Sequence, residues 1–262
     1  MEIIGYIITI VIGLLIGLFG GGGSILTVPV LVYLFLIPTS LATTYSLALV
    51  SITSLIASSP HVINKTISWK RALQFGIPSM ISLYIIRATV LPLIPSSFIL
   101  FGYLVNKNIA MLIFFAMLML VSGFYMIRQR GNEPDCINCP YKSIALIIAG
   151  VLEGLITGVV GAGGGFIIVP ILMVFGKLNM KQAVANSLLI IGVKSLIGFL
   201  SSADVMQLNF KLLAILLLIA LLGMVIGIRL NKKLKAKQLK PIFGYFVIAM
   251  GFFILIKELI IS

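Results

Sequence analysis

The stretch Gly154-Leu-Ile-Thr-Gly-Val-Val-Gly-Ala-Gly-Gly-Gly-Phe-Ile-Ile-Val-Pro170 decides the fold of this chain, because glycines interrupt an apolar segment that a proline closes. The same pattern occurs 141 residues earlier, between Gly13 and Pro29. Each glycine in a helix interior costs about 1 kcal/mol relative to alanine, so a helix ends at each run. Backbone groups freed inside a membrane must face protein, a water-filled cavity or a ligand. Paired breaks in corresponding halves therefore indicate a transporter with its binding site at the breaks.

The composition indicates a membrane protein. Of the 262 residues 61% are hydrophobic and 10% are charged, and the mean hydropathy is +1.24. The net charge of +13 does not predict nucleic-acid binding, because the basic residues lie mainly in short loops between apolar segments. The first segment lacks the basic region of a signal peptide, so we expect it to stay in the mature protein. We expect a multi-pass protein of the plasma membrane.

Ten apolar segments, five in each half, predict an all-α polytopic membrane protein built from two repeats. The first five are Ile3–Phe19, Ile25–Ile37, Leu41–Ser58, Ala72–Leu93 and Ile109–Ile127. The second five are Ile144–Val160, Phe166–Phe175, Ala183–Leu200, Leu212–Ile228 and Pro241–Leu259. The first two segments of each half are short, and we expect each pair to form a hairpin of half-helices. The repeats are residues 1–128 and 143–262, with a cytoplasmic linker at 129–142.

The distribution of Lys and Arg predicts that the two repeats are inverted relative to each other. With hairpins that return to the side they enter from, 14 basic residues fall on the cytoplasmic side and three fall outside. The cytoplasmic ones lie in the loops 59–71, 128–142, 176–182 and 229–240. With hairpins that cross the membrane, the repeats are parallel and the count is nine inside against eight outside. We therefore expect the inverted arrangement, with both termini outside.

The short helix after each glycine run begins with unsatisfied N–H groups and a partial positive charge, which together bind anions. Bare glycine backbones let an anion approach closely. The expected backbone contacts are Gly22, Gly23, Ser24, Gly163, Gly164 and Gly165. Hydroxyl and amide groups early in the third helix of each half complete the expected site: Thr43, Thr44, Ser46, Asn186 and Ser187. The alternative interpretation is that these small and polar residues serve close packing between helices.

Three ionisable residues lie inside apolar segments: Arg87, Glu153 and Lys194. Such residues are costly in a membrane, which makes them candidates for coupling or charge compensation. Glu153 could take up a proton beside the glycine break, and Lys194 could neutralise it or attract the anion. An ion pair between Glu153 and Lys194 that only locks two helices is the alternative. Arg87 could instead reach toward the outer surface.

The two cysteines, Cys136 and Cys139, form a Cys-x-x-Cys pair in the linker. Such a pair can bind a metal or act as a redox dithiol, but by itself it cannot complete a four-ligand zinc site. We therefore expect no metal and no cofactor. Because carboxylates are scarce and there is one histidine, the sequence does not favour an enzyme.

Two further boxes follow each glycine run. The first is Pro-x-Leu at Pro29–Leu31 and Pro170–Leu172, and the second is Ala-x-x-x-Ser-Leu at Ala42–Leu47 and Ala183–Leu188. The combined pattern resembles the TauE/SafE family over nearly the whole chain. This resemblance implies transport of a sulfur-containing anion such as sulfite or an organosulfonate, whereas the helix starts alone predict only a small anion.

The sequence thus predicts a secondary transporter that moves a small anion across the membrane by alternating access. An anion channel with the same glycine-lined site is the alternative. Proton coupling and assembly into a homo-oligomer are both left open.

Overall fold

The computed structural model describes residues 2–86, 89, 97–100, 103–128, 141–160, 165–202 and 208–260. Within these residues the first half contains α1 (Glu2–Phe19), the 3-10 turn η1 (Gly21–Gly23), α2 (Ser24–Tyr33), α3 (Thr39–Ile63), α4 (Trp69–Ile85) and α6 (Lys107–Arg128). The second half contains α7 (Ser143–Val160), α8 (Gly165–Val174), α9 (Met180–Leu200), α10 (Phe210–Lys233) and α11 (Ala236–Ile260).

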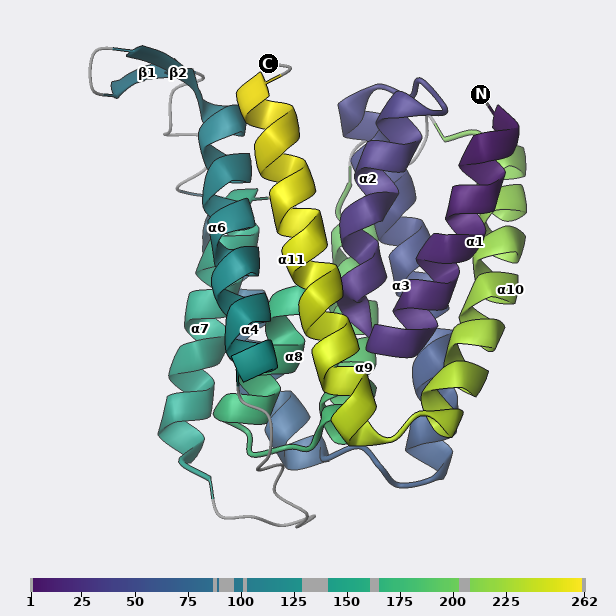
Figure 1. The fold of residues 1–262 in the computed structure, drawn as a ribbon, viewed down its shortest axis with the longest axis vertical. Coiled ribbons are helices and arrows are strands. Elements are labelled where there is room, and N and C mark those ends of the chain that lie inside the picture. Colours follow the sequence, from purple (N-terminus) through teal and green to yellow (C-terminus); the bar gives the residue numbers. More distant parts are fainter. Residues whose placement is uncertain are drawn as a thin grey trace.

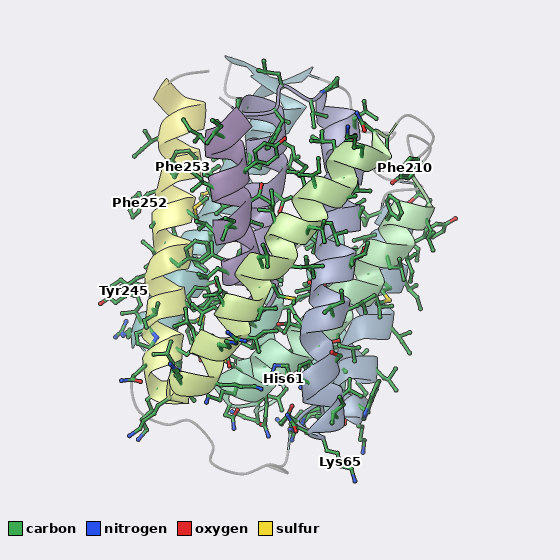
Figure 2. The ribbon with its side chains drawn as sticks, turned by 90° about the vertical axis from the view of Figure 1, so that its right-hand side faces the viewer. His61, Lys65, Phe210, Tyr245, Phe252 and Phe253 are labelled. Carbon is green, nitrogen blue, oxygen red and sulfur yellow. The ribbon has the colours of Figure 1, made fainter. Side chains whose placement is uncertain are left out.

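The predicted helical membrane fold is confirmed, because each of the ten apolar segments contains a helix within the described residues. Four of the described helices, α3, α9, α10 and α11, contain apolar stretches long enough to cross a bilayer. Shorter apolar stretches occur in α1, α6, α7 and α8. The outer surface is also apolar: Tyr245, Phe252 and Phe253 point away from α11 and are more than half exposed (Figure 2). Such a surface suits contact with lipid.

Several helix boundaries differ from the predicted ones. The basic segment expected as a loop at 229–240 is largely helical, because α10 continues to Lys233 and α11 begins at Ala236. Lys and Arg are good helix formers, so the end of an apolar run does not end the helix. The fourth predicted segment is an α-helix from Trp69 to Ile85, and Ile86 and Thr89 beyond it are π-helical.

A short β-hairpin was not predicted. Its strands β1 (Ser97–Leu100) and β2 (Tyr103–Asn106) are antiparallel and precede α6. Aromatic and β-branched residues in both strands favour this conformation over a helix.

Only the second helix of each expected hairpin is half-length. At 1.5 Å per residue, the ten residues of α2 and of α8 span roughly 15 Å, whereas the 18 residues of α1 and of α7 span roughly 27 Å. The first hairpin nevertheless returns to its starting side, because the Phe35 ring packs on the Tyr6 ring with centroids 5.3 Å apart. The expectation of two half-helices per hairpin is therefore wrong for α1 and α7.

The main helix contacts follow the repeat. The helix pairs with the most extensive contacts are α1 with α10, α4 with α7, α3 with α9, and α6 with α11. The first two pairs are equivalent under the 141-residue offset, and the other two each join equivalent helices. At α1–α10, Gly13 allows contact with the Ala220 carbonyl, and at α4–α7, Gly154 allows contact with the Ser79 carbonyl. The first helix of each repeat therefore packs against the fourth helix of the other repeat.

The loops after the short helices are also alike in the two halves. The N–H of Ile37 donates to the Leu31 carbonyl at 3.1 Å, and the N–H of Leu178 donates to the Leu172 carbonyl at 3.3 Å. Leu36 and Lys177 have φ values of 53° and 51°. A non-glycine residue with positive φ is uncommon, so its occurrence at equivalent positions is further structural evidence of the repeat.

Figure 1 shows how the chain ends and loops are distributed. The labelled N- and C-terminal ends and the β-hairpin lie at one end of the helix bundle (Figure 1). The connections α3–α4, α8–α9 and α10–α11 lie at the opposite end (Figure 1). Three of the four loops that we expect in the cytoplasm therefore share one end of the molecule.

Candidate functional site

The two glycine breaks meet each other inside the protein. A Cβ atom on Gly165, which begins α8, would lie 2.5 Å from both the Cα and the carbonyl oxygen of Gly21 in η1. Only residues without side chains permit this approach. Gly20 has a φ of 77°, a value that side chains disfavour, and it turns the chain from α1 into η1. The structure thus brings the two hairpin tips together.

The start of α2 lies at this junction. The Ser24 hydroxyl turns back and donates to the Gly21 carbonyl at 2.6 Å. Because Gly23 has no side chain, the beginning of α2 packs against Ile12 and Ile16 of α1. The start of α2, with its partial positive charge, therefore lies at the point where the two halves meet.

A cavity about the size of one water molecule lies beside the start of α2. Its lining residues are Ser24, Val28, Thr43, Ser46, Leu47, Val50 and Ser195. Ser46 and Ser195 are only 7% and 3% exposed, and within the described part of the chain their hydroxyls make no hydrogen bond. Neither hydroxyl is among the fully enclosed side-chain atoms that lack a hydrogen bond within the described residues, so both are open to the cavity. Each can therefore donate to a water molecule or to a ligand that accepts hydrogen bonds.

The cavity contains three of the predicted side chains, Ser24, Thr43 and Ser46, and one that the prediction omitted. Ser195 follows Ser187 by eight residues on α9, roughly two turns along one face. The helical spacing from Ser187 is therefore a signal in the sequence by which Ser195 could have been found.

The side chains of Asn186 and Ser187 do not line this cavity and make hydrogen bonds to the backbone instead. The Asn186 amide donates to the Gln182 carbonyl at 2.7 Å and accepts from the N–H of Ser68 at 3.1 Å. The Ser187 hydroxyl donates to the Val184 carbonyl at 2.9 Å and contacts the position where Gly20 lacks a side chain. Asn186 thus holds the start of α4, and Ser187 packs against the glycine break of the other half. Thr44 is buried in α3 but does not line this cavity.

A buried ion pair involves Lys194, the residue that precedes Ser195 on α9. The Lys194 ammonium is 3.0 and 2.9 Å from the two Glu153 carboxylate oxygens, and it donates to the Ser79 and Thr157 hydroxyls at 2.9 Å each. The Ser79 hydroxyl also donates to the Glu153 carboxylate. Since Lys194 is 7% exposed and the other three are fully buried, this cluster joins α4, α7 and α9 without access to solvent.

Five residues named in the sequence analysis lie outside the described residues: Gly163, Gly164, Arg87, Cys136 and Cys139. Across the described ranges, no group of three or more His, Cys, Asp or Glu side chains is arranged to hold a metal ion.

Comparison with known proteins shows similarity along the whole chain. A family model described as "Sulfite exporter TauE/SafE" matches residues 6–254. The "Probable membrane transporter protein MJ0441" of Methanocaldococcus jannaschii is 28% identical, covering 95% of this chain and 94% of its own length. A "Probable membrane transporter protein" of Xylella fastidiosa is 27% identical, covering 97% of both chains. "Probable membrane transporter protein YunE" of Bacillus subtilis is 26% identical, covering 94% of this chain and 96% of its own. No solved structure matches.

Proposed function

The chain belongs to the sulfite exporter TauE/SafE family and is a multi-pass membrane transporter, and from this premise we propose that it moves a small sulfur-containing monoanion by alternating access. The observation that carries the proposal is the hydroxyl-lined cavity at the start of α2, where the two glycine breaks meet. The proposed substrate class comes from the name of the family and from the chemistry of this cavity.

The cavity suits an oxyanion of low charge. Ser46 and Ser195 offer hydroxyl groups, and the start of α2 contributes a partial positive charge. Val28, Leu47 and Val50 form the apolar part of the described lining, which contains no basic side chain. The charge of the nearby Lys194 is balanced by Glu153. Helix starts and hydroxyls can compensate one negative charge more readily than two, which favours a monoanion.

The two repeats are proposed to be inverted and to move relative to each other around this cavity. The proposal is supported by the reciprocal packing of α1 on α10 and of α7 on α4. The positions of the termini and basic loops at opposite ends of the bundle also support it (Figure 1). We further propose that the structure is a closed state of the cycle, because the cavity holds about one water molecule, and that an anion enters when α2, α3 and α9 separate on one side.

Anion binding by the purified protein tests this proposal. We expect sulfite or methanesulfonate to raise the unfolding temperature of the wild type in detergent, because a ligand that binds only the folded state stabilises it. Ser46→Ala and Ser195→Ala each remove one donor and should weaken binding by roughly tenfold, in line with a charge-assisted hydrogen bond. Ser59→Ala is the matched control, because its exposed hydroxyl only donates to the Ile56 carbonyl of its own helix.

Flux measurements distinguish the transporter from an anion channel. In proteoliposomes, a transporter should show saturable uptake of labelled anion and faster uptake when unlabelled anion is present on the opposite side. Currents carried by the anion at rates far above 10³ s⁻¹, beyond ordinary turnover numbers, would favour a channel instead. If neither sulfite nor methanesulfonate binds to the protein or is transported by it, the cavity is not an anion site.

A further inference from the structure

The helices α3 and α9 run antiparallel along their contact. A Cβ atom on Gly198, near the end of α9, would lie 3.3 Å from Leu47 Cδ2, toward the start of α3. A Cβ atom on Gly192, earlier in α9, would lie 2.8 Å from Leu55 Cγ, later in α3. A step toward the end of α3 therefore corresponds to a step toward the start of α9.

Two pairs of serines lie along this contact. Ser46 of α3 and Ser195 of α9 line the anion cavity. Ser54 follows Ser46 by eight residues, and Ser187 precedes Ser195 by eight residues. Each step is twice the i, i+4 spacing and covers roughly 12 Å of helix. Both steps lead toward the end of the bundle that holds the α3–α4 and α8–α9 connections (Figure 1), so Ser54 and Ser187 form a second pair on that side.

The second pair is the repeat equivalent of the first. The 141-residue offset relates Ser46 to Ser187 and Ser54 to Ser195. The same offset relates Ser24, which begins α2 and lines the cavity, to Gly165, which begins α8. The start of α8 is therefore expected beside the second pair, as the start of α2 lies beside the first.

Printed contacts around the glycine break join Ser187 to the start of α8. A Cβ atom on Gly20 would contact Ser187 Oγ, and a Cβ atom on Gly21 would contact Ile191 Cδ1. A Cβ atom on Gly165 would in turn lie 2.5 Å from Gly21 Cα. Ser187, Ile191 and the first residue of α8 thus all meet the turn η1.

The Ser54 hydroxyl is the observation that points to a ligand. It is fully enclosed, and within the described residues it has no hydrogen-bond partner. Other buried hydroxyls of α3, those of Ser51, Thr53 and Ser58, each donate to a carbonyl of their own helix. An enclosed hydroxyl without a partner costs free energy, which alanine in the same space would avoid. The chain therefore retains a donor that this state of the protein does not use.

We propose that Ser54, Ser187 and the start of α8 form a second site for the same monoanion, which is closed in this state and opens in the opposite one. This inference rests on the proposed function and deepens it. When the two repeats exchange conformations, Ser54 donates to the anion. The Ser187 hydroxyl, which now donates to the Val184 carbonyl at 2.9 Å, rotates to do the same. The anion thereby moves by roughly 12 Å along the α3–α9 contact in each cycle.

The alternative is that Ser54 serves only as a small residue in the packing of α3 on α9. Ser54→Ala separates the two. If the second site exists, the variant should bind methanesulfonate as the wild type does in detergent, because the first cavity is intact. Its uptake of labelled methanesulfonate into proteoliposomes should be roughly tenfold slower, the effect of losing one donor to an anion. If Ser54 serves only packing, uptake stays at the wild-type rate.

Ser51→Ala is the matched control for this variant. Ser51 is fully buried on the same helix, but its hydroxyl donates to the Ala48 carbonyl at 2.9 Å. We expect this control to keep both binding and uptake.

Access from the two sides of the membrane is a second measurement. In a variant with Cys136→Ser and Cys139→Ser, sulfonatoethyl methanethiosulfonate, an anionic thiol reagent that does not cross bilayers, is applied to either side of membrane vesicles. We expect Ser54→Cys and Ser195→Cys to react from opposite sides, with Ser54→Cys reacting from the side of the α3–α4 connection. Excess methanesulfonate should slow both reactions. Ser51→Cys should react from neither side.

The outcomes separate this inference from the proposed function. Wild-type uptake by Ser54→Ala would overturn the second site and leave the cavity at α2 in place. So would loss of binding by Ser54→Ala, since this would assign Ser54 to the first cavity. Absence of reaction at Ser54→Cys, or its reaction from the same side as Ser195→Cys, would also overturn it. Failure of the wild type to bind and transport methanesulfonate or sulfite would overturn both.

Discussion

The side-chain oxygen of Asn186 in α9 lies 3.1 Å from the backbone nitrogen of Ser68, the N-cap residue directly before α4. The residues offset by 141 positions repeat this contact, because the Tyr45 hydroxyl accepts from the N–H of Asn209 at 2.7 Å where α10 begins. In both places the third helix of one repeat holds the start of the fourth helix of the other. The two contacts lie near opposite ends of the molecule, since Lys65 and Phe210, which lie nearby in sequence, are at opposite ends in Figure 2.

Removing either contact should destabilise the protein. Asn186→Ala and Tyr45→Phe each leave a backbone N–H without its partner, which costs on the order of 1–3 kcal/mol. We expect a lower unfolding temperature for both variants in detergent. Tyr245→Phe is the matched control, because Tyr245 is exposed on α11 and its hydroxyl makes no hydrogen bond within the described residues. Wild-type stability in Asn186→Ala would show that this contact does not hold α4.

Alanine at either packing glycine should also destabilise the fold. A Cβ on Gly13 would overlap the Ala220 carbonyl, and one on Gly154 would overlap the Ser79 carbonyl. The helix propensity of alanine favours the substitution by about 1 kcal/mol, but overpacking against backbone costs typically 1–3 kcal/mol or more. The clash should therefore dominate in thermal unfolding of both variants.

Gly198→Ala is the control for these substitutions, because its Cβ would meet only the flexible end of the Leu47 side chain, at 3.3 Å. It should unfold close to the wild-type temperature. If Gly13→Ala and Gly154→Ala are as stable as Gly198→Ala, the tight α1–α10 and α4–α7 contacts are wrong.

The repeat could be read from the sequence because glycine and proline leave a direct mark on the backbone. The helix break before Ser24, the start of α8 at Gly165 and the short lengths of α2 and α8 all follow from these residues. The last residue of α10 and the first residue of α11 could not be predicted in the same way, since Lys and Arg continue a helix beyond its apolar part.

The candidate site was only partly predictable. Polar residues near the glycine break could be listed, but the helix face that each residue occupies depends on how the two repeats pack. Ser46 and Asn186 both looked suitable as ligands, yet Ser46 lines the cavity and Asn186 binds the backbone of Ser68. The pairing of Glu153 with Lys194 could be proposed because two opposite charges in apolar helices are costly apart.

The topology predicts which engineered cysteines react from outside the cell. In a variant with Cys136→Ser and Cys139→Ser, a cysteine at Lys65 or Lys233 should resist a membrane-impermeant maleimide until the cells are opened, because basic loops stay in the cytoplasm. A cysteine at Lys211, at the start of α10, should react in intact cells. Reaction at Lys233 in intact cells, with none at Lys211, would reverse the proposed orientation.

Substitution at the contact between the two glycine breaks tests the proposed closed state. Gly165→Ala would place a methyl group against the backbone of Gly21, and backbone cannot turn away as the end of a side chain can. The substitution should therefore push the hairpin tips apart, which lowers the unfolding temperature and abolishes uptake of labelled anion in proteoliposomes.

Gly76→Ala separates this effect from a general intolerance of alanine, because its Cβ would lie 3.5 Å from Ile190 Cγ1, an ordinary contact distance. We expect this control to keep both its stability and its uptake. If Gly165→Ala also transports at the wild-type rate, the two tips do not need to touch during the cycle. Alternating access would then need a closing contact other than the one between Gly165 and Gly21.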